Sequence, residues 1–169
     1  LLIPLFSAGE MFNTEKLLML VPGFFAFSFV VSTIYILNDY RDREDDRKHP
    51  TKCKRPLAAG LIQPAVALAI AALLLIAGFA LAYMANPKMK FLFVLGIYFL
   101  LNVGYSLGLK NIPILDIVII AVGFVFRVKG GSIITVVPIS EWLIIMVFLL
   151  ALFMAIGKRR DDVLLKLKS

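Results

Sequence analysis

Residues 61–84 read LIQPAVALAIAALLLIAGFALAYM, a stretch without a single charged side chain. A helix needs about 20 consecutive, mainly apolar residues to cross the hydrocarbon core of a bilayer. Four further stretches of this kind lie at residues 17–37, 91–109, 112–137 and 140–157. We therefore predict an all-α, polytopic transmembrane bundle with about five spans in this chain, formed by residues 1–169 as a single domain.

The composition excludes an ordinary water-soluble globule. Hydrophobic residues make up 61% of the chain, whereas soluble domains carry about 45–50% apolar residues. Cys53 is the only cysteine, so no internal disulfide can form. Residues 1–6 are apolar but too short to span, and we interpret them as the end of an earlier helix. We expect a membrane environment and no nucleic-acid partner.

Basic residues alternate between the two sides of the predicted bundle. The segment after the first span, the loop after the third and the C-terminal tail together hold thirteen Lys and Arg residues, whereas the opposite loops hold only Lys16, Lys88 and Lys90. Because Lys and Arg are enriched on the cytoplasmic side of membrane proteins, the richer side is predicted to face the cytoplasm. Three polar segments, at residues 38–56, 105–116 and 157–162, all fall on that side.

Acidic side chains follow the end of the stretch at residues 17–37. Asn38 and Asp39 come first, and Asp42 and Asp46 follow, so that the three carboxylates are spaced i, i+3, i+7. On a helix these carboxylates share one face, where they repel one another unless a cation lies between them. Mg²⁺ commonly binds one or two protein carboxylates together with water and substrate phosphates. The spacing predicts a magnesium site for a diphosphate.

The next segment, HPTKCKRP at residues 49–56, supplies cations beside that face. Lys52 and Arg55 are candidates for binding a substrate, because Lys and Arg are the usual ligands of phosphate oxygens. The alternative is a solvated, charged loop that only fixes the topology. The position of the carboxylates at a helix end, with a common face, favours a binding site.

Further ionisable side chains lie near the same side of the membrane. Asp116 lies about one turn inside the fourth span, and an ionisable group at such a position is by default a functional hypothesis. We predict a catalytic role for Asp116 and substrate binding by its neighbours Tyr105 and Lys110. Lys158 and Arg159, which follow the fifth span, are predicted to contact phosphate.

The fourth span also contains two basic residues that can be interpreted in two ways and a glycine pair that we interpret as structural. Arg127 and Lys129 are either part of a site or long side chains that reach the outer interface. The pair at residues 130–131, Gly-Gly, is expected to loosen or end the helix.

The pattern Asn38-Asp39-x-x-Asp42-x-x-x-Asp46, followed by His49-Pro50-x-Lys52-x-x-Arg55-Pro56, resembles the first aspartate-rich signature of the UbiA prenyltransferase superfamily. Within that superfamily the chain is most similar to the decaprenyl-phosphate phosphoribosyltransferases. The similarity extends through residues 55–60, residues 105–110 with Asp116, and residues 157–159. It covers essentially the whole chain.

This resemblance implies an enzyme of the bacterial inner membrane that takes part in cell wall biosynthesis. The implied reaction moves 5-phosphoribose from phosphoribosyl diphosphate to a polyprenyl (decaprenyl) phosphate, with Mg²⁺ held by Asp39, Asp42 and Asp46. Superfamily members have around nine spans, so we expect part of the first helix and the last helices to lie outside this sequence. Members that use a prenyl diphosphate usually show a second aspartate-rich motif after the fifth span. Cations largely replace it here, although Asp161 and Asp162 keep a metal role open.

Three alternatives to this reaction make different predictions. A UbiA-type aromatic prenyltransferase that uses a prenyl diphosphate would have the same fold and predicts carboxylates instead of basic residues after the fifth span. A membrane transporter with Asp116 and Arg127 along its path predicts paired broken helices or repeats, and the sequence shows neither. A non-catalytic scaffold predicts that the acidic segment tolerates neutralisation.

Overall fold

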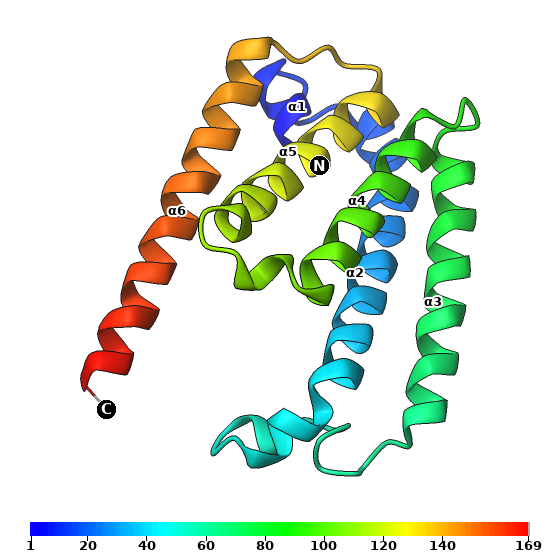
Figure 1. The fold of residues 1–169 in the computed structure, drawn as a ribbon. Coiled ribbons are helices and arrows are strands. Elements are labelled where there is room, and N and C mark those ends of the chain that lie inside the picture. Colours follow the sequence, from blue (N-terminus) through cyan, green and yellow to red (C-terminus); the bar gives the residue numbers. More distant parts are fainter. Residues whose placement is uncertain (169) are drawn as a thin grey trace.

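The computed structural model describes residues 1–168, except the side chains of Lys110, Lys166 and Lys168. Helices account for the regular structure of these residues, and no strand occurs among them. The elements are α1 (Ile3–Ser7), α2 (Thr14–Lys48), η1 (Lys52–Lys54), α3 (Pro64–Ala85), α4 (Lys90–Leu107), η2 (Leu109–Asn111), α5 (Leu115–Thr135) and α6 (Glu141–Lys168). Figure 1 shows them as one bundle of long helices.

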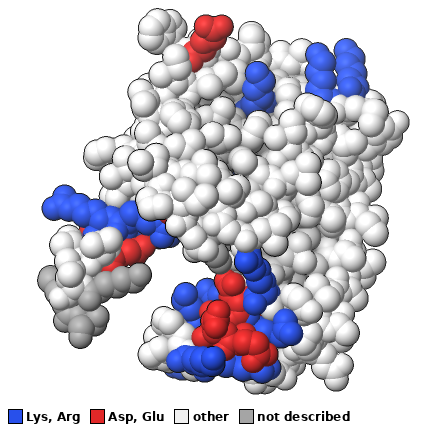
Figure 2. Space-filling model, viewed as in Figure 1, with Lys and Arg blue, Asp and Glu red and all other residues white. Residues whose placement is uncertain are grey.

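Five of these helices are long and apolar enough to cross a membrane, namely α2, α3, α4, α5 and α6. The predicted all-α bundle with five spans is therefore confirmed. Figure 2 agrees with this assignment, because the charged side chains gather toward the two ends of the molecule and leave a broad uncharged surface between them. Such a surface suits the hydrocarbon core of a bilayer.

Helix α2 is the longest element and continues well past the predicted end of the first span. Its 35 residues correspond to about 52 Å at 1.5 Å per residue, whereas the hydrocarbon core is about 30 Å thick. Asn13 caps its start, where the side chain accepts a hydrogen bond from the Lys16 amide at 3.3 Å. The segment that carries Asp39, Asp42 and Asp46 is therefore the last part of a continuous helix, as the spacing predicted.

Helices α2 and α3 lie side by side along most of their length (Figure 1). Small residues allow this approach, since a Cβ atom on Gly78 of α3 would lie 3.1 Å from Val30 Cγ2 of α2. Thr33 adds a polar contact, because its hydroxyl donates to the Ala71 carbonyl of α3 at 3.2 Å. Close packing at small residues and occasional hydrogen bonds are the usual basis of helix association in membranes.

The core lies where α2, α4 and α5 meet. The Phe27 ring packs against Phe91 and Tyr98, with ring centroids 5.6 Å and 5.2 Å apart respectively. Gly130 of α5 lies against the same rings, and a Cβ atom there would lie 2.9 Å from Phe91 Cε2. The helix does not end at Gly130 and Gly131, which was one of the two expected outcomes, because α5 continues to Thr135. Gly130 instead leaves space for the rings of Phe27 and Phe91.

Candidate functional site

The first charged cluster lies on the last turns of α2. Asp46 is buried, with only 4% of its surface exposed, and Asp39 is half-buried. One guanidinium nitrogen, Arg55 Nη1, donates to Asp39 Oδ1 at 3.0 Å and to Asp46 Oδ2 at 2.9 Å. A cation thus lies between two of the three predicted carboxylates, and this cation belongs to the protein.

The loop after α2 folds back against the helix end and brings Arg55 to this position. Arg47 Nε donates to the Ala58 carbonyl at 3.1 Å, and Arg47 Nη1 donates to Glu44 Oε1 at 3.0 Å. His49 Nδ1 accepts a hydrogen bond from the Thr51 amide at 3.2 Å. The His49 bond lies in the turn that leads into η1, and the Arg47 bond to Ala58 ties the end of α2 to the loop beyond η1.

The second charged cluster joins three helices and consists of Tyr105, Asp116 and Arg159. Tyr105 donates its hydroxyl to Asp116 Oδ1 at 2.7 Å. Arg159 binds both oxygens of the same carboxylate, with Nη2 3.0 Å from Oδ1 and Nε 2.8 Å from Oδ2. Asp116 lies in the first turn of α5, where the helix dipole favours a negative charge.

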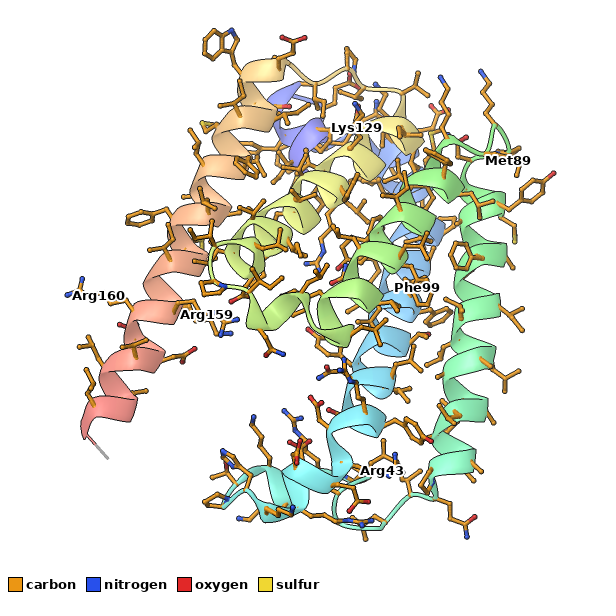
Figure 3. The ribbon with its side chains drawn as sticks, in the orientation of Figure 1. Arg43, Met89, Phe99, Lys129, Arg159 and Arg160 are labelled. Atoms are coloured by element: carbon orange, nitrogen blue, oxygen red, sulfur yellow. The ribbon has the colours of Figure 1, made fainter. Side chains whose placement is uncertain are left out.

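The end of α2 contacts the end of α4, the helix that carries Tyr105 of the second cluster. Arg41 Nη2 donates to the Leu107 carbonyl at 3.0 Å, only two residues beyond Tyr105. Figure 2 shows charged side chains near the end of α2 and near the end of α6 on either side of a hollow in the surface. In Figure 3, Arg159 points toward the loop between α4 and α5, whereas Arg160 points to the other side of α6.

A cavity of about 740 Å³ extends from the second cluster into the bundle between α2, α4, α5 and α6. Its walls are mainly apolar and include Ile34, Ile119, Val147, Leu150 and Met154. Tyr105, Lys158 and Arg159 also line it, and they lie near the ends of α4 and α6. The cavity therefore combines an apolar interior with a charged end.

Arg127 lies inside the bundle, in this same cavity. Its Nη2 atom donates to the Tyr98 hydroxyl at 2.9 Å, and its guanidinium carbon lies 5.4 Å from the Phe124 ring centroid. Arg127 therefore does not reach the outer interface but lines the cavity, and its role in a site stays a prediction; Lys129 is exposed (Figure 3). The sequence reasoning missed Tyr98 as a cavity residue. The spacing of Tyr98, Asn102 and Tyr105, i, i+4, i+7, was the signal on one face of α4.

The remaining predicted site residues are distributed as follows. Asn38 is half-buried next to Asp39 on α2, and Lys52 is exposed in η1. The Lys110 side chain lies outside the described residues. Asp162 lies 3.7 Å from Arg159 Nη1, so it supports the second cluster, and Asp161 is exposed.

Two carboxylates of α2 are enough for a magnesium site that water and substrate complete, but the residues that the structure describes do not supply a full set of ligands. Among residues 1–168, no three carboxylate, His or Cys side chains are grouped closely enough to hold a metal ion. Asp39 and Asp42 are one turn apart, and Mg²⁺ usually takes only one or two protein carboxylates and completes its shell with water and phosphate oxygens. The position of Arg55 between Asp39 and Asp46 shows that this face accommodates a cation.

Comparison with known proteins gives the same family that the aspartate pattern suggests. A decaprenyl-phosphate phosphoribosyltransferase of Corynebacterium glutamicum is 35% identical over 159 residues, which are 94% of this chain and 48% of that protein. The protein of the same name from Mycolicibacterium smegmatis is 36% identical over 137 residues, 81% of this chain and 42% of that protein. A protoheme IX farnesyltransferase of Sodalis glossinidius is 46% identical over 86 residues, 50% of this chain and 28% of that protein.

The chain thus spans about half the length, or less, of the curated relatives it matches. The pattern of the UbiA prenyltransferase family matches residues 1–168. With the five spanning helices and the carboxylate face of α2, this match establishes that the chain belongs to the UbiA prenyltransferase family.

Proposed function

We propose that the full-length protein transfers 5-phosphoribose from phosphoribosyl diphosphate to a polyprenyl phosphate. The observation that carries the proposal is the position of Lys158 and Arg159 at the charged end of a largely apolar cavity. A polyprenyl phosphate has the same division, because it joins a long apolar chain to one anionic group. Two relatives that match most of this chain carry the name decaprenyl-phosphate phosphoribosyltransferase, which favours this pair of substrates.

The acceptor lipid is assigned to the cavity and the second cluster. Its apolar chain would lie along the cavity walls of α5 and α6, and its phosphate would meet Lys158 and Arg159. Because Arg159 already binds Asp116 through two atoms, the carboxylate orients the guanidinium toward the site. Lys110 is a further candidate for a phosphate contact.

The donor is assigned to the first cluster. Asp39, Asp42 and Asp46 would hold Mg²⁺, which when bound supplies a Lewis acid that stabilises the diphosphate leaving group. Lys52 and Arg55 supply charges for the remaining phosphate oxygens, and Asn38 supplies an amide at the same end of α2. The excess of basic residues at this end favours a site at the cytoplasmic face of a bacterial plasma membrane.

The proposed transfer reaction needs no external base. The bond between ribose C1 and the diphosphate oxygen breaks, and the diphosphate leaves with the bonding electrons. An oxygen of the lipid phosphate, already anionic, attacks C1 and forms the phosphodiester. The protein's contribution is to position both anions and to stabilise charge. This agrees with a chain that has a single histidine, and whose His49 imidazole is engaged in a turn.

The test measures transfer of radiolabelled ribose phosphate to decaprenyl phosphate in membranes that contain the full-length protein. We expect label in the lipid fraction that depends on Mg²⁺ and falls at least about tenfold in Asp42→Asn, while membrane insertion is unchanged. Asp45→Asn is the matched control, because Asp45 is an exposed acid three residues further along α2. Transfer of a prenyl group from a prenyl diphosphate, without ribose transfer, would assign the chain to the prenyl-transferring branch. Full activity of Asp42→Asn would contradict the metal assignment.

A further inference from the structure

We propose that Arg55 is an exchangeable counter-cation: it holds the carboxylates of α2 in the metal-free protein and moves to a substrate phosphate when a divalent cation binds. The inference rests on the proposed function, since it assigns a metal and a diphosphate to this face. It adds that Arg55 binds the carboxylates of α2 before the metal arrives and a substrate phosphate afterwards.

The geometry makes Arg55 a direct competitor of a metal ion. One nitrogen atom lies 3.0 Å from Asp39 and 2.9 Å from Asp46, so it occupies the space between carboxylates that are seven residues apart. Asp46 is 4% exposed, and a buried carboxylate needs a paired charge to remain ionised. A metal ion that draws Asp39 toward itself therefore weakens one of the two bonds that hold Arg55.

Arg55 differs in its bonded partners from Arg47, which lies in the last turn of α2. The Arg55 side chain is 38% exposed, and its ion-pair partners are both predicted metal-site residues. Arg47, by contrast, is tied at once to Glu44 and to the Ala58 backbone carbonyl. An arginine has five donors in a planar fork that matches phosphate as well as carboxylate, so a diphosphate can replace the contacts that Arg55 gives up.

This exchange predicts two effects of opposite sign in Arg55→Gln. Without the competing guanidinium, a divalent cation alone should bind more tightly. With a diphosphate present, the complex should be weaker, because Arg55 no longer contacts the anion. A residue that only stabilises the fold would shift both affinities in the same direction or neither.

The experiment measures Mn²⁺ binding to full-length protein in lipid nanodiscs by the electron paramagnetic resonance signal of free Mn²⁺. Mn²⁺ is used because it binds the same oxygen ligands as Mg²⁺. We expect Arg55→Gln to bind Mn²⁺ about fivefold more tightly than wild type, the effect of removing about 1 kcal/mol of competing ion pairs. In the presence of Mn²⁺ we expect it to bind inorganic diphosphate about tenfold more weakly.

Arg47→Gln is the control, since it removes the same charge from the neighbouring end of α2 but not from between the two carboxylates. Equal behaviour of the two variants would overturn the exchange while leaving the metal site intact. No Mn²⁺ binding by wild type, even with diphosphate, would overturn the metal-dependent function as well. If Arg55→Gln does not fold, Arg55→Lys replaces it. Lys keeps the charge and loses the fork, so the same two opposite shifts are expected, each about twofold.

Discussion

The ion pair between Asp116 and Arg159 should couple α5 to α6, and a double-mutant cycle can measure the coupling. The pair is bidentate, with distances of 2.8 Å and 3.0 Å between its atoms. Asp116→Ala removes both contacts and the hydrogen bond from Tyr105, which measures 2.7 Å. The pair joins residues that are 43 positions apart in the sequence, so its loss should weaken the packing of α6 on α5.

The exposure of the two side chains sets the expected coupling free energy. A hydrogen bond to a charged group contributes about 1.5–3 kcal/mol when it is shielded from water, whereas an exposed ion pair contributes about 0.2–1 kcal/mol. The Asp116 side chain is only 10% exposed, but that of Arg159 is 43% exposed. We therefore expect a coupling free energy of about 1.5 kcal/mol, between these limits.

The assay follows unfolding of the full-length protein in mixed micelles by circular dichroism, for Asp116→Ala, Arg159→Ala and the double variant. The control cycle pairs Asp116→Ala with Arg160→Ala, because the Arg160 side chain is exposed and points away from the cluster (Figure 3). We expect the control coupling to stay below about 0.3 kcal/mol, as for independent sites. A coupling this small for Arg159 itself would refute the view that the pair joins the two helices.

Two further changes test the bundle interior. Tyr98→Phe keeps the ring but removes the hydroxyl that accepts from Arg127 at 2.9 Å, so we expect a loss of about 1–2 kcal/mol in the free energy of unfolding; Tyr83→Phe, at an exposed tyrosine, should change it by less than about 0.5 kcal/mol. Gly78→Leu would force a side chain into α2, because an added Cβ atom alone would lie 3.1 Å from Val30 Cγ2, and it should cost about 1–3 kcal/mol in the free energy of unfolding. Gly157→Leu is its control, because a Cβ atom there meets nothing within 4 Å, and equal losses from the two leucines would contradict the packing of α3 on α2.

The sequence predicts the spans well because the length of an apolar stretch is itself the physical requirement for crossing a bilayer. It does not predict which face of each span packs inward. Phe91 and Leu95 of α4 are fully buried, whereas Phe93 and Leu100 of the same helix are about 70% exposed. Lipid and protein interior are equally apolar, so the hydrophobic pattern carries no signal that separates the two faces.

The candidate site, like the spans, could be predicted from the sequence only in part. The carboxylates of α2 could be grouped from the sequence, because their spacing on one helix fixes their common face. The partners of those carboxylates could not, since Arg55 reaches Asp39 and Asp46 through the conformation of a loop. The pairing of Asp116 with Arg159 likewise depends on how α5 and α6 pack, which local periodicity does not encode.

Both clusters share an electrostatic property that bears on substrate choice. Two of the basic side chains predicted to bind phosphate, Arg55 and Arg159, are each bound to carboxylates. A single anion that takes Arg55 leaves Asp39 and Asp46 without their cation, and at the buried Asp46 this loss is costly. A diphosphate that arrives with a divalent cation supplies both replacement charges at once. We therefore expect the first cluster to favour metal-complexed, multiply charged donors over singly charged anions, which is the selectivity that the proposed phosphoribosyl diphosphate site requires.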